Sequence, residues 1–171
     1  GYVSQLQGQG LILEGARRVY ALGRLALVTN RAAGRDLRRL EDLSSPQVRY
    51  VSIANPDHAP YGRAARQAME NAGVWELVRP KVVFGENVRQ ALQFVQTGNA
   101  EAGIVALSIA DVPDVTYTLI DPGLYEPLRQ EMAVIRGTGQ EGAAREFLAF
   151  VSGPRGSAIM RKYGFVLPGG T

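Results

Sequence analysis

The chain has 171 residues, of which 46% are hydrophobic, and carries a formal net charge of +3 from 19 basic and 16 acidic residues. It contains no cysteine, which excludes disulfide frameworks, thiolate metal sites and cysteine nucleophiles. The basic residues are scattered and only 8% of all residues are aromatic, so we expect no nucleic-acid partner. The apolar runs are too short to cross a bilayer, so we expect no stable membrane insertion.

The N-terminal segment reads GYVSQLQGQGLILEG and has no initiator methionine, no basic-then-apolar signal segment and no cleavage site. The sequence therefore starts after processing or partway through a longer protein. Within this segment, QGQG precedes a strand-like stretch instead of opening a helix, so it does not indicate a dinucleotide site.

Strand-like and helix-like segments then alternate along the chain. The expected strands are RLALVTN (24–30), VRYVSIAN (48–55), KVVFG (81–85), AGIVAL (102–107), VTYTLID (115–121) and QEMAVIRG (130–137). The expected helices are 61–72, a helix capped by Asn87, 141–152 and 154–163, with a short helix or turn over 36–45. This alternation is typical of βαβ units, which form a largely parallel sheet covered on both faces. We therefore predict an α/β fold.

Apolar side chains recur at helical spacing in the expected helices. In 61–72 the stripe consists of alanines and one methionine and ends at Gly73. In 141–152 it consists of Ala144, Phe147, Leu148 and Val151, which we expect to face inward.

No sequence pattern for catalysis is present: there is no Gly-x-Ser-x-Gly, no phosphate-binding loop, no His-Glu-x-x-His and no Gly-x-Gly-x-x-Gly after a strand. The one histidine, His58, lies between Pro56 and Pro60, and we interpret it as a structural or surface residue. We therefore expect no enzyme, no catalytic residue, no direct metal ligand and no cofactor.

Two strand-to-helix junctions are the remaining candidates for a site: VSIANPDHAPYGRAA and VVFGENVRQAL. The first amides of a helix lack internal acceptors, and the helix dipole favours an anion there by about 0.3–1 kcal/mol. Two such termini facing one cleft would bind a small oxyanion through backbone amides. The candidate residues are Tyr61, Gly62, Asn87 and Val88, and Gly62 would let a ligand approach the backbone closely.

Three blocks carry a family resemblance: ANPDHAPYGRAARQAMENAGVW, GENVRQALQFVQTGNAEAGIVALS and AAREFLAFVSGPRGSAIMRKYGF. They resemble the molybdate-binding proteins of ABC transporters, and the match is dense from Ser52 to Phe165. The resemblance implies two α/β lobes, a periplasmic-binding-protein-like α/β/α architecture that closes on a dehydrated tetrahedral oxyanion, molybdate or tungstate. It implies that the amides of Tyr61 and Val88 bind this ligand. It further implies delivery to an ABC permease at the periplasmic or extracellular face of the cytoplasmic membrane, by a free or lipid-anchored protein.

The sequence departs from the family pattern at two places. Some members present a tyrosine hydroxyl where this chain has Ala106, and Ser108 is the candidate replacement donor. The serine-bearing segments of the first lobe, roughly the first third of the family's chain, are not present. We therefore expect a partial first lobe over 1–25, a complete second lobe over 26–132, and helices returning to the first lobe over 133–171. Such a chain would bind the anion weakly and self-associate, or a second chain would complete it.

Two other classes of function remain as alternatives. Similar bilobed domains sense effectors in transcriptional regulators, although no helix-turn-helix is evident in this sequence. An enzyme on the same architecture would need a nucleophile–base pair, and none is recognisable.

Overall fold

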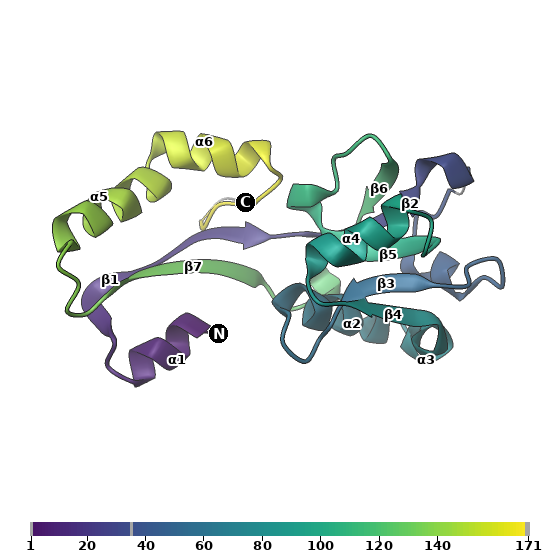
Figure 1. The fold of residues 1–171 in the computed structure, drawn as a ribbon, viewed down its shortest axis with the longest axis horizontal. Coiled ribbons are helices and arrows are strands. Elements are labelled where there is room, and N and C mark those ends of the chain that lie inside the picture. Colours follow the sequence, from purple (N-terminus) through teal and green to yellow (C-terminus); the bar gives the residue numbers. More distant parts are fainter. Residues whose placement is uncertain (1, 35, 170–171) are drawn as a thin grey trace. The chain divides into compact units, whose positions relative to one another are not determined.

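The structure is a computed structural model that describes residues 2–34 and 36–169. The chain divides into two compact units: unit 1 comprises Gly1–Gly23 and Arg129–Thr171, and unit 2 comprises Arg24–Leu128 (Figure 1). Each unit is described separately below.

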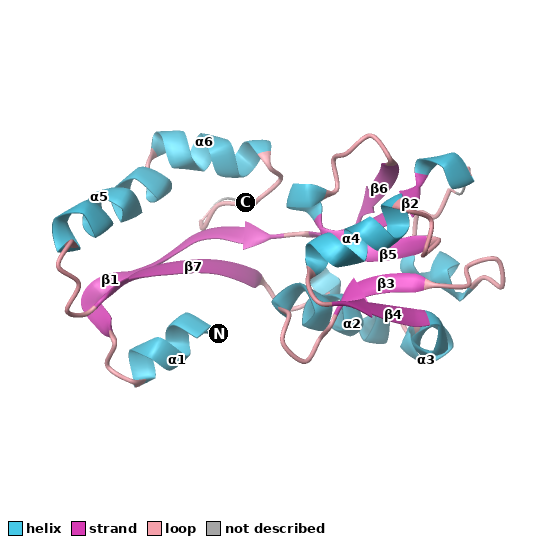
Figure 2. Ribbon diagram, in the orientation of Figure 1, coloured by secondary structure: helices cyan, strands magenta, loops and turns pink. Residues whose placement is uncertain are grey.

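Unit 2 is built on a five-stranded mixed sheet with the order β4-β3-β5-β2-β6 (Figure 2). Its strands are β2 (Leu25–Asn30), β3 (Val51–Ala54), β4 (Val82–Gly85), β5 (Ala102–Ala106) and β6 (Val115–Leu119). Strand β3 runs parallel to β4 and β5, whereas β2 runs antiparallel to β5 and β6. The expectation of a largely parallel sheet is therefore wrong at β2. The segment after β2 forms only short 3-10 turns, and an antiparallel strand does not require the helical crossover that a parallel pair needs.

Helices cover both faces of this sheet, which confirms the predicted α/β/α layering (Figure 1). On one face, α2 (Pro60–Asn71) and α3 (Trp75–Val78) pack over a core that includes Met69 and Ile53. On the other face, α4 (Val88–Gln96) packs over Val28 and Val105. The buried faces of α2 and α4 pack directly on the strands, so their N-termini are held against the sheet.

Strand β3 is shorter than the predicted strand over 48–55. The amides of Arg49 and Tyr50 donate to Glu101 Oε2, at 3.2 and 2.8 Å. These two amides are satisfied by a side chain instead of a neighbouring strand, and the ladder begins only at Val51.

Unit 1 contains the two-stranded sheet of β1 (Ile12–Gly23) and β7 (Leu128–Ile135). It also contains α1 (Tyr2–Gly8), α5 (Glu141–Ser152) and α6 (Pro154–Lys162). Arg17 forms a salt bridge with Glu131 at 2.7 Å across the two strands, and Leu22 pairs with Val166. The sequence patterns predicted β7, α5 and α6 closely, but not α1 or the full length of β1.

The apolar stripe of α5 is not buried as expected. None of its residues is fully buried; Ala144, Leu148 and Val151 are half-buried, and Phe147 is 62% exposed. A two-stranded sheet offers too little surface to cover the whole stripe. The helical spacing of these residues was predicted correctly, but the inward orientation of Phe147 was not.

Candidate functional site

The carboxyl ends of β3, β4 and β5 lie at one edge of the unit 2 sheet. The parallel register aligns Ala54 with Gly85, and Ile53 with Ile104. From this edge the chain continues into α2, into α4 and into the 3-10 turn Leu107–Ile109. Ligands of open α/β sheets bind at such an edge, where loops lead into helix N-termini.

The first helix N-terminus at this edge has no side-chain cap. Ala59 occupies the N-cap position and makes no side-chain hydrogen bond, and Pro60 follows as the first helical residue. The Arg63 amide donates to Ala59 O at 3.1 Å. The amides of Tyr61 and Gly62 precede this bond and belong to the turn whose N–H groups point out of the helix end.

The structure shows a packing role for Gly62 that the sequence did not indicate. A Cβ added to Gly62 would lie 2.0 Å from Ala54 O and 2.8 Å from Ala54 C. Gly62 is therefore required by the close approach of α2 to the end of β3. Access of a ligand to the backbone does not have to be invoked to explain this glycine.

The second helix N-terminus is partly capped by Asn87. Its Oδ1 accepts hydrogen bonds from the Arg89 and Gln90 amides, at 3.0 and 3.1 Å. Asn87 therefore satisfies the second and third amides of α4 and orients the first turn. Val88 N, the first amide, is not used by this cap.

Hydrogen bonds join the two junctions directly. Asn55 N donates to Gly85 O at 2.8 Å, and His58 Nε2 lies 2.9 Å from Glu86 O. The two helix N-termini, which belong to opposite faces of the sheet, are thereby held at one edge. This role of His58 is not predictable from the sequence, because no local pattern indicates which carbonyl a loop side chain will reach.

The last two predicted residues lie on the third loop of the same edge. Ala106 ends β5 and is 3% exposed. Ser108 is half-buried in the following 3-10 turn, which is anchored by the bond from Leu107 N to Arg24 O at 2.9 Å. The methyl group of Ala106 cannot donate a hydrogen bond, whereas the hydroxyl of Ser108 can.

The groups that could bind a ligand at this edge are mainly backbone N–H donors. Among residues 2–34 and 36–169, no group of three or more histidine or carboxylate side chains is arranged to hold a metal ion. His58 is exposed, and its Nε2 is hydrogen-bonded to the carbonyl oxygen of Glu86. This ring nitrogen therefore has no free lone pair with which to bind a metal ion or accept a proton.

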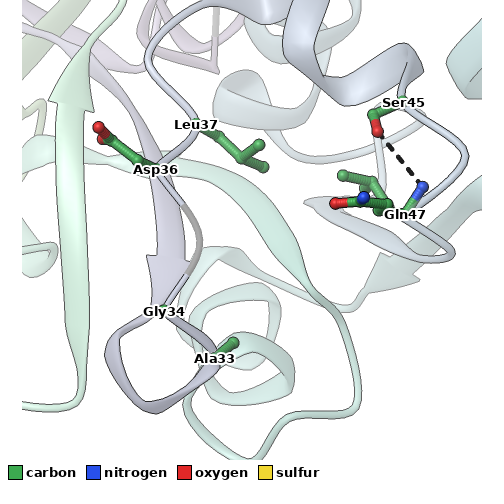
Figure 3. A pocket seen from close by; sticks show the side chains of 7 residues that line it. Ala33, Gly34, Asp36, Leu37, Ser45 and Gln47 are labelled. Carbon is green, nitrogen blue, oxygen red and sulfur yellow. Dashed lines mark hydrogen bonds between the residues drawn. The ribbon is translucent and has the colours of Figure 1, made fainter.

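A separate cavity of about 450 Å³ lies at the opposite edge of unit 2 (Figure 3). It is lined by Ala33, Gly34, Asp36, Leu37, Ser45, Gln47 and Val48. Its polar groups bond locally: Arg38 Nε donates to the Asp36 carboxylate at 2.9 Å, and Ser45 Oγ accepts from Gln47 N at 3.3 Å. Figure 3 shows the Asp36 carboxylate pointing away from Leu37, so these groups do not converge on one point. We do not assign a ligand to this cavity.

An α/β unit with two helix N-termini joined at the carboxyl edge of its parallel strands has the architecture of a small-ligand binding lobe. The sequence model of the bacterial extracellular solute-binding protein family matches residues 1–166, and the chain belongs to that family. This membership confirms the resemblance inferred from the three sequence blocks at the level of the family. No helix in the described part of the chain is long and apolar enough to cross a membrane.

Individual relatives share both sequence and fold with the chain. It is 34% identical over 168 residues to the molybdate-binding protein ModA of Azotobacter vinelandii, covering 95% of this chain and 66% of that protein. It is 33% identical over 162 residues to the ModA of Rhodobacter capsulatus, covering 92% of this chain and 62% of that protein. The chain therefore spans less than two thirds of the length of both. The solved structure of the Azotobacter vinelandii periplasmic molybdate-binding protein superimposes with a TM-score of 0.82 at 28% identity, over 97% of this chain and 74% of that one.

Proposed function

We propose that the chain binds a tetrahedral oxyanion, molybdate or tungstate, and delivers it to the permease of an ABC transporter outside the cytoplasmic membrane. The observation that carries the proposal is the hydrogen-bonded pair of junctions, which holds the N-termini of α2 and α4 at one edge. The similarity to two molybdate-binding relatives and to the superimposed periplasmic molybdate-binding protein supports the choice of molybdate.

The amides of Tyr61, Gly62 and Val88 are the proposed donors. Each helix N-terminus adds partial positive charge, so the site needs no lysine or arginine to attract an anion. Asn87 contributes by orienting the first turn of α4, because its side-chain oxygen is already bonded to two amides. On the third loop, Ser108 is a proposed hydroxyl donor and Ala106 a proposed apolar wall.

Selectivity would come from the fixed spacing of these donors. Sulfate has the same charge and shape as molybdate but is smaller, so fewer of its oxygens would reach good hydrogen-bond distance at once. We expect weak binding by unit 2 alone, because an anion held from one side remains partly hydrated, and water exclusion strengthens each bond.

The test is a calorimetric titration with molybdate, tungstate and sulfate of the chain and two variants, Val88→Pro and Val88→Ala. Proline at the first helical position removes only the N–H, and the extended conformation of Asn87 (φ −152°, ψ 175°) is compatible with a following proline. Because one charge-assisted hydrogen bond is lost, we expect Val88→Pro to bind molybdate about tenfold or more weakly than Val88→Ala. Both variants remove the branched, half-buried side chain of Val88, so their difference mainly reports the amide.

Three outcomes would contradict the proposal: no binding of either larger anion, sulfate binding as tight as molybdate binding, or equal affinities of the two Val88 variants.

A further inference from the structure

The imidazole of His58 connects the loop ahead of α2 with the loop ahead of α4. Its Nε2 lies 2.9 Å from Glu86 O, across 28 residues of sequence. A carbonyl oxygen can only accept a hydrogen bond, so Nε2 carries a proton and donates it to Glu86 O.

The loop that carries His58 has little freedom of its own. Pro56 and Pro60 fix the backbone φ angle on either side of the histidine. The Ala59 amide donates to Asn55 O at 2.9 Å, which closes the turn around it. The backbone that carries the imidazole is therefore held close to the N-terminus of α2.

The loop at the other end of the contact is also held. Glu86 N donates to Gln90 Oε1 at 2.6 Å, and Asn87 Oδ1 accepts from the Arg89 and Gln90 amides. The peptide group that supplies Glu86 O is thus tied to the first turn of α4. The contact between His58 and Glu86 consequently joins two small rigid bodies, one at each helix N-terminus.

We propose that His58 is a positioning residue: through Glu86 O it fixes the spacing between the amides of Tyr61 and Gly62 on α2 and the amide of Val88 on α4. The inference rests on the proposed anion function of this edge. Hydrogen-bond strength falls steeply with distance and angle, so a site made of fixed amides depends on the groups that hold them. The bond also engages a carbonyl oxygen whose partial negative charge would repel an anion if the peptide turned towards it.

The test compares His58→Gln with His58→Met in the full chain. The glutamine amide nitrogen reaches about as far as Nε2 and donates, whereas methionine has a similar length and no donor. We expect His58→Gln to bind molybdate within about threefold of the parent chain, and His58→Met to bind about tenfold more weakly. We also expect the ratio of molybdate to sulfate affinity to fall in His58→Met, because looser spacing discriminates less between anions of different size.

Hydrogen exchange measured without ligand separates positioning from the anion function. In His58→Met we expect the amides of Asn55, Ala59 and Glu86, which are hydrogen-bonded in the two loops of the parent chain, to exchange faster than in the parent, and in His58→Gln to exchange at the parent rate. If the parent chain bound no oxyanion but the variants showed this exchange pattern, the proposed function would be wrong. The role of the His58–Glu86 hydrogen bond in holding the two loops together would still be supported.

Three results would overturn the positioning role. In the first, His58→Met matches the parent chain in exchange and affinity. In the second, His58→Gln is as weak as His58→Met, which would mean that the donated proton is not what matters. A loss of stability with an unchanged affinity ratio would likewise assign His58 to stability alone.

Discussion

Glu101 is a buried carboxylate that organises the amino ends of β3 and β5. It is 8% exposed and accepts hydrogen bonds from the amides of Arg49 and Tyr50 and from Arg49 Nε, the last at 3.0 Å. Burial alone raises the pKa of this carboxyl group, but the bonds from the Tyr50 amide and the Arg49 side chain outweigh burial, so its pKa lies below the ordinary value. Because the folded-state pKa is depressed, the ionised group stabilises the fold above the unfolded-state pKa, and this stability is lost as pH falls through the folded-state pKa.

We predict that Glu101→Gln lowers the free energy of unfolding by about 1–2 kcal/mol near neutral pH, because an amide replaces a buried carboxylate that accepts from two backbone amides and a guanidinium. The difference from the parent chain should shrink as the pH falls below about 4, where the unfolded-state carboxyl group takes up a proton. Urea unfolding followed by the fluorescence of the single tryptophan, Trp75, reports unit 2 at each pH.

The control for this prediction is Glu70→Gln. Glu70 pairs with Arg66 on the exposed surface of α2, and both side chains are more than 40% accessible, so the change should be below about 0.5 kcal/mol. A difference between Glu101→Gln and the parent chain that stays constant from neutral to acid pH would contradict the assigned role of the charge.

At the scale of elements, α2 and α4 were predictable because their determinants are local. The alanine stripe and Gly73 define α2, and the Asn87 cap defines the start of α4. The features that the sequence did not reveal depend on distant residues: β3 is shortened by Glu101, and the antiparallel direction of β2 depends on which strands it pairs with. The same distinction applies to the site, where the two helix N-termini were predicted and the link from His58 to Glu86 was not.

At the contact between α2 and β3, helix propensity and packing predict opposite effects of the substitution Gly62→Ala on stability. Propensity alone says that Gly62→Ala stabilises a helix by about 1 kcal/mol. Packing says that the new Cβ would lie 2.0 Å from Ala54 O, a backbone atom that cannot move without shifting the strand end. We expect packing to dominate and Gly62→Ala to destabilise unit 2 by about 1–3 kcal/mol.

Gly142→Ala in α5 is the matched control, since a Cβ at Gly142 would meet nothing within 4 Å. This substitution should be neutral or stabilising by up to about 1 kcal/mol. Thermal unfolding of both variants and the parent chain, followed by circular dichroism, measures the two effects. Stabilisation by Gly62→Ala would show that the close approach of α2 to β3 is not maintained in solution.

At the scale of the whole molecule, several large apolar side chains on and next to α5 and α6 are exposed in the single chain. Phe147 and Phe150 on α5 are 62% and 48% exposed, and Ile159 on α6 and Tyr163 at its C-cap are 47% and 53% exposed. The two helices are joined through the single residue Gly153. Large apolar side chains at a protein surface favour association, so we predict self-association of the chain through unit 1.

We predict that the parent chain sediments with a mass above that of one chain, increasing with concentration, and that Phe147→Gln combined with Phe150→Gln shifts it towards the monomer, because burial of these two rings drives the association. Leu77→Gln on α3 is the control, because Leu77 has the same 62% exposure in unit 2 and should leave the mass unchanged. A parent chain that is monomeric at every concentration, or a double variant that associates like the parent, would exclude α5 as the contact. Titration of the double variant with molybdate then tests whether association affects binding. An affinity equal to that of the parent chain would mean that unit 2 binds molybdate without a second chain. A loss of affinity would mean that association completes the site.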